Sequence, residues 1–290
     1  MTSLADSVPP RRPLRRASSD AVRLPTFLVI GAARSGSTWI SKNLARHPEV
    51  FIPKEKELHF FDRRYEEGIE TYRAYFRAAT AEKAIGEATP AYLHTAAAAP
   101  RIRAHLPDVK LIACLRDPID RLYSRYWNAR GRFEHNKDVS FERKIEEKPE
   151  LIREGYYAEH LARFYELFPR ERLLVLLYDD LISDPRAFLK RIYRFLGVDE
   201  SFSSDLADHK INAGASQKLT VKSRPVYWVG KALHRLGRHR LAMHIERANA
   251  GRLPELSPST RSMLLEKYYR ERNERLAALL GVDLSHWNSV

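Results

Sequence analysis

The stretch that decides the fold is residues 27–39, Phe-Leu-Val-Ile-Gly-Ala-Ala-Arg-Ser-Gly-Ser-Thr-Trp. An apolar run over residues 27–30 is followed by a loop with two glycines, three hydroxyl side chains and Arg34. A loop of this kind between a buried strand and a helix turns backbone N–H groups and the positive helix end toward one point. The stretch therefore predicts an anion site at the end of the first strand.

The alternation of apolar strand and amphipathic helix continues along the chain. Further strands are predicted at residues 84–86, 110–115 and 172–177. Their continuous apolar runs indicate burial on both faces, which is typical of a parallel sheet covered by helices. Two apolar stripes at helical spacing predict helices between the strands: Ile119, Leu122, Tyr123, Tyr126 and Trp127, and then Leu161, Phe164, Tyr165 and Phe168. We expect an α/β fold, a central parallel sheet flanked by helices, with functional residues just after each strand.

Composition limits the class of protein. A chain of 290 residues, 44% of them hydrophobic, can bury a large core. One cysteine, Cys114, excludes an internal disulfide framework and a cysteine-based zinc site, which favours a reducing, cytoplasmic compartment. The histidines show no metal-ligand spacing, so no metal is expected. No apolar run reaches the length of a membrane span.

The net charge of +13 indicates an anionic ligand or partner, and it is concentrated in two places. Residues 1–24 carry five arginines against two aspartates and are interpreted as a disordered basic leader before a single domain over residues 25–290. Residues 210–250 hold nine lysines and arginines against Glu246 alone. After this stretch, Ser257 and Pro258 are typical of a helix start, and Gly281 of its end.

The first loop nearly matches the phosphate loop of nucleoside triphosphatases, but Ser37 stands where those enzymes have lysine. The basic residue is Arg34, inside the loop. Without the lysine that holds the β- and γ-phosphates, ATP hydrolysis is poorly supported.

A second signal follows the strand over residues 110–115. Arg116 precedes Asp117 and Pro118, which suit the start of a helix, and Ser124 comes eight residues after Arg116. By itself this pattern also fits a capped helix with no ligand. Beside a phosphate loop, however, Arg116 and Ser124 form a plausible second phosphate clamp, because guanidinium binds phosphate in bidentate fashion. Two such sites indicate a nucleotide phosphorylated at two places.

These motifs resemble those of the sulfotransferases that use 3′-phosphoadenosine 5′-phosphosulfate (PAPS). Residues 34–39 are similar to the family's 5′-phosphosulfate loop, and Arg116 with Ser124 is similar to its 3′-phosphate motif. The resemblance covers essentially residues 26–290. Further segments match, in order, the branch with the heparan sulfate sulfotransferases and bacterial relatives: residues 56–62, 89–92, 157–161 and 171–181.

The resemblance implies a P-loop-containing sulfotransferase fold and the transfer of a sulfonyl group from PAPS to an acceptor hydroxyl or, less favoured, an amine. It implies that Glu57 is the base, that His59 supports it or is a rival base, and that Arg34 stabilises the leaving group. The residues it assigns to nucleotide binding are Arg34, Ser35, Gly36, Ser37, Thr38, Trp39, Arg116, Ser124 and Tyr157, with Lys218 and Lys222 in a segment that closes over the nucleotide. Those it assigns to the acceptor are His59, Asp62 and Thr89. Tyr157 fits equally the start of the next helix.

One departure from the family concerns the acceptor. Ala88 stands where the heparan-modifying branch usually has a lysine, so we expect a carbohydrate, glycolipid or other hydroxylated metabolite over a heparan chain. Two other classes remain open, a basic nucleic-acid-binding protein and an ATP-dependent small-molecule kinase. The first lacks a recognisable binding module and the second lacks the loop lysine.

Overall fold

The computed structural model describes residues 23–132, 139–208, 220–221, 223–251 and 254–289. Its centre is a sheet of five strands in the order β2-β3-β1-β4-β5, and every neighbouring pair in it is parallel. The strands are β1 (Phe27–Gly31), β2 (Val50–Phe51), β3 (Ala84–Ala88), β4 (Lys110–Leu115) and β5 (Leu173–Leu177). The predicted parallel α/β sheet is thereby confirmed.

The four predicted strands all exist, with ends that differ by no more than two residues. The strand β2 was not predicted, because its two residues are too few to show a periodicity. It extends the sheet by pairing Val50 with Ala84 and Phe51 with Ile85.

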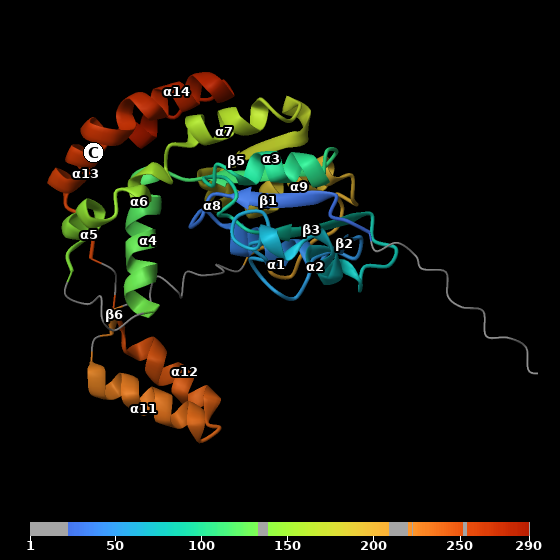
Figure 1. The fold of residues 1–290 in the computed structure, drawn as a ribbon. Helices are drawn as coiled ribbons and strands as arrows, with labels where there is room; N and C mark the ends of the chain where they lie inside the picture. Colours follow the sequence, from blue (N-terminus) through green and yellow to red (C-terminus); the bar gives the residue numbers. More distant parts are fainter. Residues whose placement is uncertain (1–22, 133–138, 209–219, 222, 252–253, 290) are drawn as a thin grey trace, which may run out of the picture.

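Helices cover both faces of the sheet (Figure 1). Along β1, Leu28 and Ile30 face one apolar cluster while Phe27 and Val29 face another, because successive side chains of a strand point to opposite faces. The first cluster includes residues of α3 (Ala98–His105), α7 (Tyr157–Tyr165) and α14 (Arg270–Leu280). The second includes residues of α1 (Ser37–Leu44) and α9 (Pro185–Leu196). This burial on both sides explains why the strands are apolar throughout.

A third apolar cluster lies beside the sheet and is built mainly by helices. Its helices are α4 (Pro118–Arg132), α5 (Phe141–Glu147), α6 (Glu150–Arg153), α13 (Pro258–Leu264) and a π-helical turn at Leu265–Tyr269. The predicted start of the last helical region is confirmed, since Ser257 Oγ accepts a hydrogen bond from the Thr260 amide at 3.1 Å. Its predicted end is also confirmed, with Gly281 in the left-handed conformation at φ 66°.

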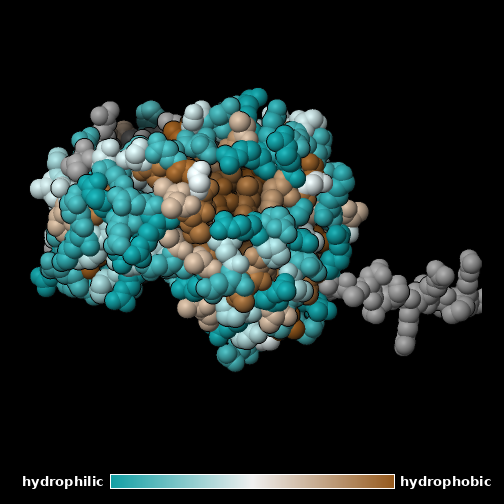
Figure 2. All heavy atoms as spheres, turned by 90° about the horizontal axis from the view of Figure 1, so that it is seen from above, coloured by the Kyte–Doolittle hydropathy of each residue, from teal (hydrophilic) through white to brown (hydrophobic). Residues whose placement is uncertain are grey.

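Two further helices stand away from the sheet, α11 (Arg224–Arg235) and α12 (His239–Ala248) (Figure 1). The short strands β6 (Thr220–Val221) and β7 (Ala250–Gly251) pair antiparallel beside them. No helix in the described part of the chain has both the length and the apolar character to span a membrane. On the face seen from above, hydrophobic residues are visible in the middle of the molecule and hydrophilic residues surround them (Figure 2).

Most of the predicted leader lies outside the described residues. Arg23, which belongs to it, donates hydrogen bonds from Nη1 to the carbonyl oxygens of Thr80 (3.3 Å) and Glu82 (2.9 Å). Leu24 packs against the first apolar cluster. These last two residues are therefore part of the folded domain, because they find hydrogen-bond and apolar partners there.

Candidate active site

The loop between β1 and α1 has the backbone that an anion site requires. Arg34 and Gly36 both adopt left-handed conformations, with φ of 72° and 92°. A side chain at position 36 would lie 2.8 Å from Leu181 Cδ2, so glycine is needed there for space as well as for its conformation. Gly36 caps α1 without a side-chain hydrogen bond, so no side chain there competes with a ligand for the first amides of the helix. The loop is suited to binding a phosphate group through those amides.

Arg34 connects this loop to the second predicted motif. Its Nε donates to Ser124 Oγ at 3.1 Å and its Nη1 donates to Asn128 Oδ1 at 3.3 Å, both on α4. The two predicted motifs therefore meet, as expected of neighbouring parallel strands whose carboxyl ends share one edge. Asn128 was not predicted, although its place four residues after Ser124 puts it on the same face of the helix.

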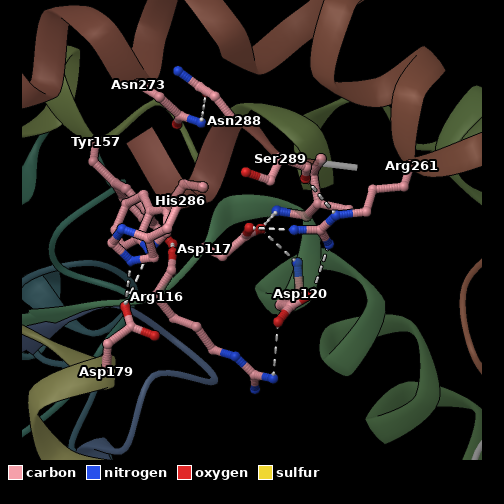
Figure 3. Close-up of polar contacts among 12 residues, drawn as sticks. Arg116, Asp117, Asp120, Tyr157, Asp179, Arg261, Asn273, His286, Asn288 and Ser289 are labelled. Carbon is pink, nitrogen blue, oxygen red and sulfur yellow. Dashed lines mark hydrogen bonds and ion pairs between the residues drawn. The ribbon is translucent and has the colours of Figure 1, made fainter. Parts of the chain in front are cut away.

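Arg116 follows β4 at the same edge of the sheet (Figure 3). Its guanidinium lies over the ring of Tyr178 at 4.9 Å, and its Nη2 is 3.7 Å from Asp120 Oδ2. Tyr178 begins α8 (Tyr178–Ser183), directly after β5. The side chain of Arg116 is 25% exposed, so it remains accessible to a ligand.

Asp117 caps α4, as its place before Pro118 predicts. Its Oδ1 accepts hydrogen bonds from the amides of Ile119 (2.8 Å) and Asp120 (3.0 Å), while its Oδ2 accepts from Arg261 Nη2 at 2.6 Å (Figure 3). Burial, and the charge of Asp120, raise the pKa of Asp117. Helix α13 is thus tied to the helix that carries Ser124.

The predicted catalytic carboxylate lies beside an imidazole. Glu57 Oε2 is 3.5 Å from His59 Nε2, and His59 Nδ1 is 2.8 Å from Asp62 Oδ2. Glu57 and His59 both have positive φ, 60° and 53°, which is rare for residues with side chains and recurs at functional sites. The structure brings together Glu57, His59 and Asp62, three of the four residues that the sequence assigns to proton transfer and acceptor binding.

Lys56 links this carboxylate to the phosphate loop. Its Nζ lies 3.0 Å from Glu57 Oε1 and also donates a hydrogen bond to Thr38 Oγ1 in the first turn of α1. Lys56 was not singled out from the sequence, because a lysine within a charged run normally belongs to the solvated surface. The contact with Thr38 joins the candidate base to the candidate anion site.

The buried carboxyl of Glu87 is linked to His59 through Thr89. The His59 amide donates to Thr89 Oγ1 at 3.3 Å, and Thr89 Oγ1 donates to Glu87 Oε2 at 2.7 Å. Tyr72 also donates to Glu87, at 3.4 Å. Burial raises the pKa of Glu87 to about 7. Thr89 is fully buried, so the structure gives no support to its predicted contact with an acceptor and places it as a support for His59.

Other predicted site residues are placed as follows. Trp39 is buried in the core, edge-on to Phe188 at 6.0 Å between ring centroids, so its indole does not reach the loop surface. The side chain of Trp39 therefore does not have its predicted role in nucleotide binding, because its ring packs in the core against Phe188. Tyr157 begins α7 and donates its hydroxyl to the carbonyl oxygen of Arg116 at 2.9 Å. Lys218 and Lys222 lie outside the described residues.

The site consists of a phosphate loop after β1, a carboxylate linked to that loop through Lys56, and Arg116 after β4. Its place at the carboxyl ends of parallel strands is where nucleotide-binding proteins of this fold class hold their ligands. Residues 24–223 match the family described as "Sulfotransferase domain". The chain belongs to this sulfotransferase family.

Curated relatives and a solved structure are consistent with this assignment. The chain is 38% identical to the "Membrane-associated sulfotransferase kil1" of Dictyostelium discoideum, over 44% of this chain and 29% of that protein. It is 33% identical to the human "Heparan sulfate glucosamine 3-O-sulfotransferase 3B1", over 62% of this chain and 48% of that protein. The chain therefore matches less than half the length of either relative. A crystal structure of a sulfotransferase from Alicyclobacillus acidocaldarius superposes with a TM-score of 0.70 at 25% identity, covering 92% of this chain and 100% of that one.

Proposed function

We propose that this chain transfers a sulfonyl group from PAPS to a hydroxyl group of a carbohydrate, glycolipid or other hydroxylated small molecule. Membership of the sulfotransferase family supports the reaction type, and the similarity to a 3-O-sulfotransferase supports a hydroxyl acceptor. The observation that carries the proposal is the contact of Lys56 with both Glu57 and Thr38. It puts a candidate base beside a phosphate loop, which is what transfer from a phosphate-linked donor requires.

The described residues fit the donor. PAPS has a phosphosulfate at its 5′ position and a phosphate at its 3′ position, and when bound it supplies the activated sulfonyl group. Ser37 and Thr38, which open α1, are assigned to the 5′ group, and Arg116 and Ser124 to the 3′-phosphate. Arg34, which contacts Ser124, spans the two.

The roles of the side chains follow from these positions. We assign Glu57 to take the proton of the acceptor hydroxyl, and Arg34 and Lys56 to stabilise negative charge on the leaving phosphate. Asp62 orients His59 through the contact at Nδ1. The Oδ1 atom of Asp62 is buried and has no hydrogen-bond partner among the described residues. The side chain is only 4% exposed, so we assign Asp62 to holding His59 and not to direct contact with the acceptor.

The donor proposal is tested by thermal unfolding with adenosine 3′,5′-bisphosphate at low metal, against ATP with magnesium. A ligand that binds only the native state raises the unfolding temperature. We expect stabilisation by the bisphosphate, and loss of that stabilisation in Arg116→Ala. A preference for ATP with magnesium would contradict the proposal and favour a kinase.

The acceptor class is tested by mass spectrometry across a panel of hydroxylated carbohydrates, glycolipids and heparan fragments incubated with PAPS. We expect a gain of one sulfo group on a carbohydrate or glycolipid and none on heparan, because Ala88 is buried and supplies no cation at the place of the branch's lysine. Sulfation of heparan fragments alone would overturn this choice of acceptor.

A further inference from the structure

The helices α11 and α12 form an antiparallel pair that stands apart from the sheet and the site described above (Figure 1). They meet at Gly230, where a side chain would lie 3.2 Å from Glu246 Cγ, and at Ala242, which is fully buried. Glycine lets the two helices approach closely. The two helices therefore contact each other through small residues. Larger apolar side chains of the pair lie on its surface.

The pair exposes an unusual amount of apolar surface. Of the nine large hydrophobic side chains that are exposed among the described residues, five belong to these two helices and a sixth, Leu236, directly follows α11. They are Val226, Trp228, Val229, Leu236, Leu241 and Met243. Leu236 is 73% exposed and Trp228 is 56% exposed. A soluble domain rarely clusters such residues on its surface without a partner for them.

These side chains follow the helical period. Val226 and Val229 on α11, and Leu236 at its C-terminal cap, recur at spacings of three and seven residues and lie along one stripe. Trp228 lies at the outer edge of this stripe. On α12, Leu241 and the partly buried Ile245 are one turn apart. In antiparallel helices that meet at Gly230 and Ala242, the stripes on α11 and α12 fall on the same side of the pair.

The same two helices are strongly basic. Residues 223–249 contain six lysines and arginines and one acidic residue, Glu246, which lies 3.2 Å from His234 Nε2. Lys231, Arg235 and Arg238 are exposed. A second copy of the chain would bring like charges together at this surface, and a nucleic acid or acidic polysaccharide would leave the apolar stripe in water.

We propose that the pair α11–α12 docks onto an anionic lipid bilayer, with the stripe of Val229, Leu236 and Leu241 in the headgroup region and the basic side chains against lipid phosphates. Helices with an apolar face bearing tryptophan and leucine and a polar face rich in lysine and arginine bind at this interface. Anionic lipids attract the basic residues, and burial of the stripe adds a contribution that salt does not screen.

The test uses the full chain with vesicles of phosphatidylcholine, with or without phosphatidylglycerol. We expect sedimentation with the anionic vesicles, weaker sedimentation with phosphatidylcholine alone, and partial loss at high salt. Trp228 is the exposed one of the four tryptophans, since Trp39, Trp127 and Trp287 are all buried. A blue shift of tryptophan fluorescence on vesicle addition is therefore expected, and it should disappear in Trp228→Phe.

The decisive variant is Val229→Glu with Leu236→Glu, which should lose vesicle binding while keeping the unfolding temperature and the response to adenosine 3′,5′-bisphosphate. Val282→Glu changes an exposed apolar residue outside the pair and should bind vesicles normally. Full vesicle binding by the double variant would overturn the proposal. The proposal would also be overturned if the chain failed to bind vesicles and instead used the stripe to form a dimer or to bind soluble heparin. None of these measurements depends on sulfonyl transfer.

Discussion

At the scale of single residues, Glu57 lies between two kinds of neighbour. Its carboxylate faces a lysine that contacts the phosphate loop and an imidazole that is held by Asp62. A base in this position can act on an acceptor while the cation beside it serves the donor. The proximity of the two groups links proton transfer to charge stabilisation within one short segment.

Glu57→Gln should lower turnover by about 10²-fold or more, because a general base contributes that much and glutamine cannot accept the proton. Affinity for adenosine 3′,5′-bisphosphate, measured by calorimetry, should change little. Glu55→Gln alters an exposed carboxylate in the same charged run and should keep full activity. Near-normal turnover in Glu57→Gln would show that Glu57 is not the base and would favour His59 in that role.

Glu87 makes stability depend on pH. Its pKa is raised by burial from 4.5 to about 7, so the folded state retains a proton that the unfolded state loses between these values. Stability is therefore greatest below pH 4.5 for this group and falls as pH rises to about 7, by about 3 kcal/mol in total. Glu87→Gln has the shape of the protonated carboxyl but does not titrate, so it should remove this decline in urea unfolding measured across that range. An unchanged pH dependence, with Glu66→Gln as the exposed control, would argue against a buried, protonated Glu87.

At the scale of elements, α13 stabilises the start of α4 through a single guanidinium. Arg261 donates from Nη1 to Asp120 at 2.9 Å and from Nη2 to Asp117 at 2.6 Å (Figure 3). Asp120 is also 3.7 Å from Arg116. The two carboxylates beside Arg116 are thus balanced by a residue from the far end of the chain.

Arg261→Ala should weaken binding of adenosine 3′,5′-bisphosphate about tenfold, equivalent to about 1.4 kcal/mol, because Asp117 and Asp120 then oppose the anionic ligand without compensation. Calorimetric titration measures the affinity. The matched control is Arg275→Ala on α14, whose exposed ion pair with Glu271 is remote from α4 and should have no effect. Equal affinity in both variants would show that α13 is irrelevant to the nucleotide site.

At the scale of the whole molecule, the last turn of the chain, Ser285–Asn288, packs behind the site. Trp287 is 1% exposed, donates from Nε1 to Asp179 Oδ2 at 3.0 Å, and lies 6.4 Å from the ring of Tyr157. Tyr157 in turn holds the backbone of Arg116. The end of the chain therefore takes part in positioning a strand end at the centre of the fold.

Trp287→Ala should lower the free energy of unfolding by about 3 kcal/mol or more, the usual result of emptying a buried aromatic site. Urea denaturation provides the measurement. Trp228→Ala is the matched control, and because Trp228 is 56% exposed its effect should remain within about 0.5 kcal/mol. Similar losses in the two variants would mean that Trp287 is not part of the cooperative core.

Much of the fold and part of the site could be predicted from local patterns. The apolar run before Gly31 predicts a strand buried on both faces, and the glycine at position 36 predicts a left-handed turn. Both features depend only on a few neighbouring residues. The cap at Asp117 and the helix end at Gly281 are local in the same sense. Strand β2 escaped prediction because two residues carry no period.

The sequence alone determined the parallel sheet, the phosphate loop and the order of the motifs, because each depends on periodicity or on turn chemistry between neighbours in the chain. The tertiary structure decided that Arg34 meets Asn128, that Lys56 bridges to Thr38, and that Arg261 balances the acids beside Arg116. It also showed that Thr89 and Trp39 are buried in the interior. Contacts between residues far apart in the chain leave no local pattern, so only the packing of helices on the sheet settles them.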